Sequence, residues 1–174
     1  MSKSVYIKQA LEAALPIMLG YVAIGVPCGI LNASIGLNVL QVFLLSVLFY
    51  SGAGQFMLPN MYLAGAPLAS IIASISLVNT RQMLYSASFA PFCDKERKRL
   101  TFLFGATVTD ESFGVNTEKF EEGNWSVKHA LWVNIFSCAS WTVSNSLGVI
   151  IGGLINIPLA VASFAMTSIF VCLM

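Results

Sequence analysis

The most constraining feature of this sequence is a series of long apolar runs separated by short polar segments. A helix that crosses the hydrocarbon core of a bilayer needs about 20 mostly apolar residues. The first run, residues 11–31, has that length, and further runs of similar character follow it. Backbone groups inside a bilayer must be hydrogen-bonded within the protein, which favours α-helices. The sequence therefore predicts an all-α, polytopic integral membrane helical bundle.

The composition agrees with this prediction and argues against other classes. Hydrophobic residues make up 57% of the chain and charged residues only 10%, with a mean hydropathy of +0.79. Soluble domains carry about 25% charged residues. The net charge of +1, without a basic stripe, argues against a nucleic-acid partner. The sequence has no HExxH, P-loop or GxSxG motif, so we expect no enzyme, no catalytic residue, no metal and no cofactor.

About six apolar segments should form a single transmembrane transporter domain over residues 1–174. They cover residues 11–31, 39–63, 68–89, 100–115, 130–155 and the stretch from Pro158 onward, and a polar loop is expected at 116–128. The sixth segment stops at Met174 without a flanking charge or interfacial aromatic residue. We therefore expect a truncated C-terminus. Residues 11–90 and 99–174 are candidate halves of a 3+3 inverted repeat, an arrangement found in many transporters.

The second segment, residues 39–63, is poorly suited to one plain helix. Its 25 residues would reach about 37 Å, more than the hydrocarbon thickness of about 30 Å. Glycines among small polar residues at 51–55 invite a break. We expect a discontinuous spanning helix or a re-entrant hairpin. The basic loop at 94–99 and the N-terminal lysines both favour the cytoplasmic side, and both lie there only if the segment is re-entrant.

Three charged residues lie inside apolar runs: Arg81 in the third run, and Asp110 and Glu111 in the fourth. Each opposes insertion by roughly 2.5–3.5 kcal/mol at a helix centre, so these side chains need partners or a wet cavity. The two helices are joined by the basic loop and run antiparallel, which places Arg81 and Asp110 roughly 13–17 Å from the same membrane surface. We predict an ion pair between Arg81 and either acid near the midplane. We interpret it as a solute or proton site, the alternative being a purely structural pair.

Other polar residues recur at helical spacing in the apolar runs. In the third run Ser74, Arg81, Tyr85 and Ser88 share one face, with Asn79 and Gln82 elsewhere. The fifth run carries a second stripe, made of Asn134, Cys138, Trp141, Asn145, Gly148 and Gly152. Polar stripes in membrane helices face protein or water, so Tyr85 and Asn134 are candidate substrate-binding residues. Asn79, also in the third run, is a further candidate. For Gly25, Gly29, Gly148 and Gly152, close packing between helices is the favoured interpretation.

The break in the second segment is another candidate site. Exposed backbone groups at a helix break can bind a carboxylate or an ion. Gly52, Gly54 and Gln55 are therefore candidate substrate-binding residues. The alternative is a kink that only shapes packing.

Three motifs in these regions carry a resemblance to a known family: Val78–Tyr85, Ser51–Phe56 and Thr109–Phe113. With these motifs the chain resembles, over essentially its whole length, the AzlC family of branched-chain amino-acid permeases. The resemblance implies a multi-pass exporter of valine, leucine and isoleucine in a bacterial cytoplasmic membrane. It also implies a small AzlD-type membrane subunit as a partner. Members of the family are usually longer than this chain.

These observations lead to the hypothesis of a secondary transporter. The substrate's carboxylate would dock at the break around Gly52–Gln55 or on Arg81, and its ammonium would meet Asp110 or Glu111. Apolar residues such as Phe56 and Phe113 would receive the aliphatic side chain, and one carboxylate would exchange a proton to couple export to the proton gradient. The alternatives are a channel or pore subunit for a small solute or ion, and a non-transporting membrane scaffold subunit.

Overall fold

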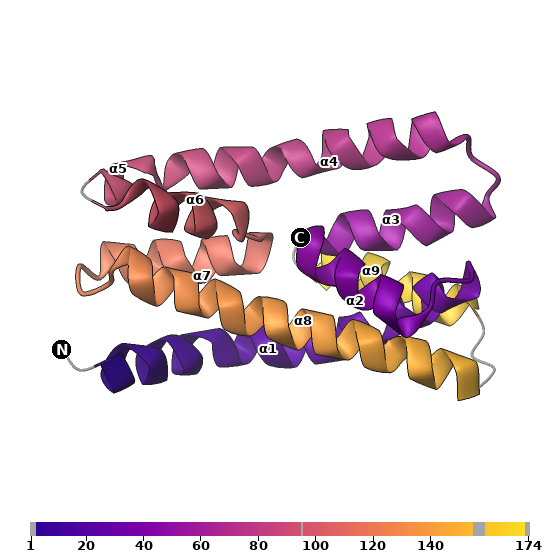
Figure 1. Ribbon diagram of the computed structural model, residues 1–174, viewed down its shortest axis with the longest axis horizontal. Coiled ribbons are helices and arrows are strands. Elements are labelled where there is room, and N and C mark those ends of the chain that lie inside the picture. Colours follow the sequence, from indigo (N-terminus) through magenta and orange to yellow (C-terminus); the bar gives the residue numbers. More distant parts are fainter. Residues whose placement is uncertain (1–2, 95, 155–158, 173–174) are drawn as a thin grey trace. The chain divides into compact units, whose positions relative to one another are not determined.

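The computed structural model describes residues 3–94, 96–154 and 159–172, and every regular element in these ranges is an α-helix (Figure 1). The prediction of an all-α protein is confirmed. The helices are α1 (Lys3–Ser34), α2 (Val39–Leu48), α3 (Gly52–Leu63), α4 (Leu68–Ser88), α5 (Ala90–Cys93), α6 (Lys98–Ala106), α7 (Asp110–Glu121), α8 (Val127–Leu154) and α9 (Leu159–Cys172).

Two of these helices are long and apolar enough to cross a membrane, over Val5–Ser34 in α1 and Val127–Leu154 in α8. The shorter helix α2 is also apolar. The total number of spans stays a prediction. The predicted start of the last segment, Pro158, and the chain end at Met174 lie outside the described residues.

The chain divides into two compact units, which are described separately. Unit 1 comprises Met1–Leu19 and Thr80–Ala139, and unit 2 comprises Gly20–Asn79 and Ser140–Met174. Helices α5, α6 and α7 belong to unit 1, whereas α2, α3 and α9 belong to unit 2. The single transporter domain over residues 1–174 and the repeat halves 11–90 and 99–174 stay predictions.

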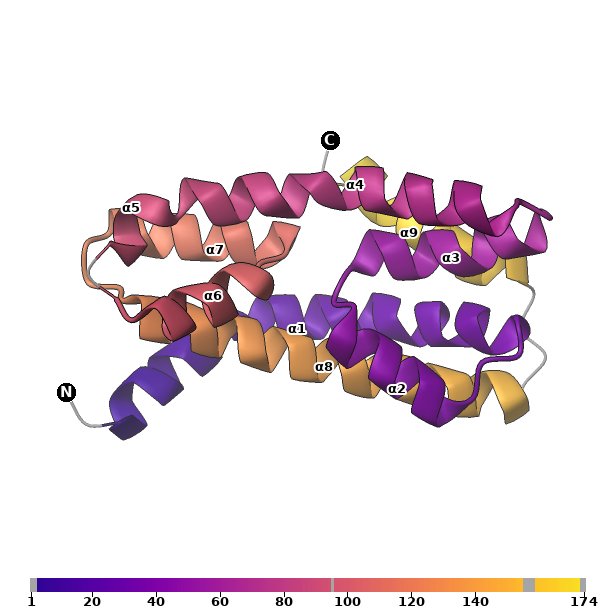
Figure 2. The same cartoon turned by 45° about the horizontal axis from the view of Figure 1, so that its top comes forward.

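In unit 2 the segment 39–63 forms a helical hairpin. Figures 1 and 2 show α3 running in the direction opposite to α2, the geometry expected of a re-entrant segment. The break falls at residues 49–51, slightly before the predicted position at 51–55. The cause is the Ser51 side chain, whose Oγ accepts a hydrogen bond from the Gly54 amide at 3.1 Å and so caps α3. Gly52 and Gly54 consequently lie in the first turn of that helix.

In unit 1 the fourth apolar run, residues 100–115, is also a hairpin, which corrects the prediction of one straight helix. It breaks at residues 107–109, and α7 returns opposite to α6 (Figure 2). Thr109 and Ser112 form a reciprocal capping box at the start of α7. Asp110 and Glu111 lie in the first turn, where the helix dipole favours negative charge. Helix α7 continues to Glu121, so the loop predicted at 116–128 is mostly helical.

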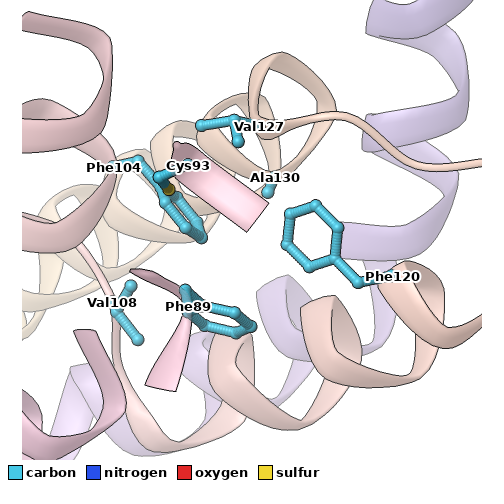
Figure 3. Packing of buried hydrophobic residues seen from close by; sticks show 7 residues of the cluster. All are labelled: Phe89, Cys93, Phe104, Val108, Phe120, Val127 and Ala130. Atoms are coloured by element: carbon cyan, nitrogen blue, oxygen red, sulfur yellow. The ribbon is translucent and has the colours of Figure 1, made fainter. Parts of the chain in front are cut away.

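A cluster of buried side chains holds the α6–α7 hairpin in unit 1. Phe89, which directly follows α4, packs with Phe104 of α6, Val108 of the break and Phe120 of α7 (Figure 3). Cys93, Val127 and Ala130 complete the cluster. A polar contact adds to this packing, because the Ser86 hydroxyl of α4 donates to the Gly105 carbonyl of α6 at 2.6 Å. The hairpin is thus tied to α4 by both apolar and polar contacts.

In unit 2 the predicted close packing at the glycines is confirmed, and the structure shows that the helices involved are α1 and α8. A methyl group added at Gly29 would overlap the backbone oxygen of Asn145, and one added at Gly148 would overlap that of Val26. The same test places a methyl at Gly25 2.7 Å from the Ser144 Cβ. Glycine is required at these positions because the two backbones approach so closely.

We predict that Gly29→Ala destabilises the protein by about 1–3 kcal/mol, the usual cost of overpacking a tight contact. The measurement is thermal unfolding of the purified chain in detergent. Gly20→Ala is the matched control on the same helix, since its methyl would have no described atom within 4 Å. Equal melting temperatures for the two variants would contradict the close α1–α8 packing.

We also predict that the double variant Ser86→Cys/Gly105→Cys forms a disulfide on mild oxidation. The Ser86 Cβ lies 3.6 Å from an ideal Cβ at Gly105, inside the range of about 3.5–4.5 Å seen in disulfides. The readout is the loss of two labelable thiols relative to the reduced double variant, while each single variant keeps its one added thiol after the same treatment. Unchanged labelling after oxidation would show that α6 does not lie on α4 in this way.

Candidate functional site

The most distinctive polar group of unit 1 is an ion pair between α4 and the start of α7. Arg81 Nη2 lies 3.0 Å from Asp110 Oδ2. The Tyr85 hydroxyl donates to the other carboxylate oxygen, Asp110 Oδ1, at 2.8 Å. The side chains of Arg81 and Asp110 are 28% and 33% exposed, so the pair is only partly covered by protein. The predicted pairing of Arg81 with an acid of the fourth run is confirmed, and the acid is Asp110.

Local sequence explains how these three residues meet. Arg81 and Tyr85 are four residues apart on α4, which places them on the same helix face. Asp110 is the first residue of α7 because the chain breaks at 107–109 and Thr109 caps the new helix. The break therefore places the Asp110 carboxylate at the tip of the hairpin. On a continuous helix the same side chain would point sideways from the helix axis.

An aromatic pair borders the carboxylate. The rings of Tyr85 and Phe113 are stacked, with centroids 4.6 Å apart and planes inclined by 20°. Phe113 is partly buried and packs against the aromatic cluster beneath it. Charged and apolar surfaces thus lie side by side at the start of α7, which is the combination an amino acid with an apolar side chain requires.

Asn134 of α8 secures the other side of the hairpin tip. It is fully buried, and its Nδ2 donates to Thr107 Oγ1 at 3.1 Å and to the Phe104 carbonyl at 3.4 Å. Its Oδ1 accepts from Asn116 Nδ2 at 3.1 Å, and Asn116 Oδ1 accepts from Trp125 Nε1 at 3.2 Å. The Asn134 amide thus makes hydrogen bonds on both sides, which connect α8 to the end of α6 and to α7.

Sequence reasoning missed Asn116 and Trp125, because both lay in the stretch predicted as a polar loop. Asn116 is fully buried, and it faces Asn134 only because α7 extends past the predicted end of the run. Ser112, Asn116 and Phe120 recur at helical spacing and are buried in α7, but two of them are polar, so apolar periodicity does not identify them.

The remaining candidates form a separate cluster in unit 2, around the break between α2 and α3. Gln55 is fully buried. Its Oε1 accepts from Ser46 Oγ at 3.2 Å and from Trp141 Nε1 at 3.1 Å, and its Nε2 donates to the Phe49 carbonyl at 2.6 Å. The amide thus satisfies the groups left by the break, in line with the alternative of a kink that shapes packing.

Asn79, Gly52 and Gly54 belong to the same cluster. The Ser51 hydroxyl donates to Asn79 Oδ1 at 2.6 Å, which links α3 to α4. A methyl at Gly52 would lie 3.6 Å from the Trp141 ring, and one at Gly54 would press against the Phe49 ring at 2.8 Å. The first turn of α3 is therefore packed by aromatic side chains. Phe56 lines a separate pocket of about 400 Å³ within unit 2, between residues of α3, α4 and α9.

Comparison with known proteins places the chain in a family. The family model for the AzlC protein matches residues 16–155. A membrane protein of Archaeoglobus fulgidus is 27% identical over 177 residues, which cover 100% of this chain and 77% of the relative. The inner membrane protein YgaZ of Escherichia coli is 27% identical, over 80% of this chain and 58% of its own length.

A further relative has a functional name. The branched-chain amino acid transport protein AzlC of Bacillus subtilis is 26% identical over 174 residues, covering 94% of this chain and 65% of the relative. No solved structure matches the chain. The family match over residues 16–155 includes all three motifs on which the resemblance rests. It also includes both residues of the Arg81–Asp110 pair. This chain is therefore a membrane protein of the AzlC family.

Proposed function

We propose that this chain is the transport subunit of a secondary transporter that exports valine, leucine and isoleucine across a bacterial cytoplasmic membrane, as a multi-pass protein. The observation that carries the proposal is the Arg81–Asp110 ion pair, which lies at the tip of a hairpin between apolar segments. The branched-chain amino acid transport protein of Bacillus subtilis supports the choice of substrate. From family membership we also propose a small AzlD-type subunit as the partner.

A zwitterion suits this ion pair for an electrostatic reason. An amino acid presents a carboxylate and an ammonium on one carbon, so it can insert between Arg81 and Asp110 and give each a new partner of opposite charge. No charge is left uncompensated in the low-dielectric segment, and uncompensated charge is what makes the breaking of an ion pair costly. The guanidinium binds the carboxylate through two parallel N–H groups. Asp110 binds the ammonium while Tyr85 continues to donate to its other oxygen.

The apolar part of the substrate would lie against the aromatic pair beside the charges. Tyr85 and Phe113 provide a stacked apolar surface next to Asp110. Arg81 is a better carboxylate site than the break at Gly52–Gln55, because the Gln55 amide already makes three hydrogen bonds inside unit 2. Gly52, Gly54, Gln55, Asn79 and Asn134 then act by holding the two breaks in shape.

Glu111 is our candidate for proton coupling. It follows Asp110 directly, and adjacent residues on a helix point about 100° apart. It therefore leaves the helix in a different direction from Asp110 while remaining in the first turn of α7. In this scheme Asp110 stays charged to bind the ammonium, and Glu111 takes up and releases the proton that drives export.

We expect Arg81→Ala and Asp110→Asn each to lower efflux of labelled valine and leucine by about 10- to 100-fold, since a hydrogen bond to a charged group is worth about 1.5–3 kcal/mol. Efflux is measured from cells that express the chain with its presumed AzlD-type partner. Lys98→Ala and Glu118→Gln are matched controls on exposed helical positions of unit 1. A folded Arg81→Ala protein with normal saturable efflux would contradict the proposed site, and non-saturable flux would favour a channel.

We expect Glu111→Gln to retain substrate binding but to make efflux insensitive to the proton gradient. The measurement compares valine efflux before and after a protonophore collapses the gradient, in the native chain and in the variant. Glu118→Gln on the same helix should behave as the native chain. If Glu111→Gln cells still respond to the protonophore, the proton is carried by another group.

A further inference from the structure

A pocket in unit 1 combines positive charge with apolar surface, and its lining does not include Arg81 or Asp110. It has a volume of about 460 Å³ and is lined by Glu96, Arg97, Arg99, Leu100, Leu103 and Lys128. We propose that this pocket binds the headgroup of an anionic phospholipid. The proposal does not depend on the proposed transport function.

The charges of the pocket come from two helix starts. Arg97 is the N-cap of α6, Arg99 lies in its first turn, and Lys128 lies in the first turn of α8. These three cations face one acid, Glu96, so the lining has an excess of positive charge. Arginine pairs bind phosphate oxygens with good geometry, and lysine adds a compact point charge.

The position of the pocket along the chain indicates a lipid as the source of the anion. Arg97 and Arg99 lie in the charged segment 94–99, at the start of α6. Basic groups at such a boundary attract the anionic lipids of the cytoplasmic leaflet. The loop's four basic residues also favour its placement on that side.

Two leucines in the lining argue against a soluble anion. Leu100 and Leu103 are one turn apart on α6, and Leu103 is 53% exposed. Free phosphate would gain nothing from these side chains. A phospholipid places its phosphate and the first carbons of its acyl chains within one headgroup length of each other, and so can use both parts of the lining.

The test is lipid retention by the purified full chain in detergent, with native mass spectrometry as the readout. Phosphatidylglycerol should be retained in preference to phosphatidylcholine with the same acyl chains. Arg99→Gln/Lys128→Gln should weaken phosphatidylglycerol binding on the order of tenfold. The control Lys8→Gln/Lys119→Gln removes the same charge at positions outside the pocket, and its exposed pairs with Glu12 and Glu122 contribute little to stability.

A second pair of variants tests the apolar part of the site. Leu103→Ser should reduce phosphatidylglycerol retention several-fold, whereas Phe102→Ser, which removes an exposed side chain of α6 outside the lining, should not. Equal retention of both lipids, or equal losses in the two double variants, would overturn the proposal. So would full displacement of phosphatidylglycerol by millimolar inorganic phosphate, because the site would then accept a soluble anion.

Discussion

The cost of charge in an apolar segment is the constraint on which the rest of this structure depends. Arg81, Asp110 and Glu111 lie in predominantly apolar runs, and each would oppose membrane insertion if left alone. The molecule meets this cost by pairing Arg81 with Asp110 at 3.0 Å and by adding the Tyr85 hydroxyl to the carboxylate. The pair is only partly covered by protein, which is the basis for the proposed exchange of partners with a zwitterion.

Helix breaks leave backbone N–H and C=O groups without helical hydrogen-bond partners, which is also costly in an apolar environment. The chain compensates for this cost at two breaks in a similar way. The hairpins α2–α3 and α6–α7 each have a three-residue break, followed by a 12-residue helix. A hydroxyl side chain caps that second helix in both, Ser51 in unit 2 and Thr109 in unit 1. A buried side-chain amide then forms hydrogen bonds with residues at each break, Gln55 in unit 2 and Asn134 in unit 1. Irregular backbone is tolerated at membrane depth when it is buried in protein in this manner.

Charged residues of unit 1 are divided by location between two kinds of role. The pair at the tip of the α6–α7 hairpin lies between apolar segments, whereas Arg97, Arg99 and Lys128 lie at helix starts beside the charged loop. The first location is the proposed site for exchange of partners with a zwitterion. The second suits the headgroup of a lipid, because it offers excess positive charge next to leucine side chains.

Much of the fold class and part of the site followed from the sequence alone. Apolar runs of spanning length determined a helical membrane protein, and the burial cost of charge determined that Arg81 had to meet an acid. Close helix packing was likewise expected from Gly25, Gly29, Gly148 and Gly152 at helical spacing, although the pairing of α1 with α8 came from the structure. These features depend on local composition and on the free-energy cost of burying charge. That cost is the same whichever segments are neighbours in the fold.

Only the tertiary structure decided where the fourth run breaks, how far α7 extends and which residues secure the hairpin tip. The break at 107–109 is stabilised by Asn134 and by the Ser86–Gly105 contact, and each of these partners is many residues away along the chain. Asn116 has a structural role only because α7 and α8 bring it to Asn134. Hydrophobic periodicity records the burial of a segment but not the identity of its neighbours, so hydrogen bonds between distant segments could not be derived from it.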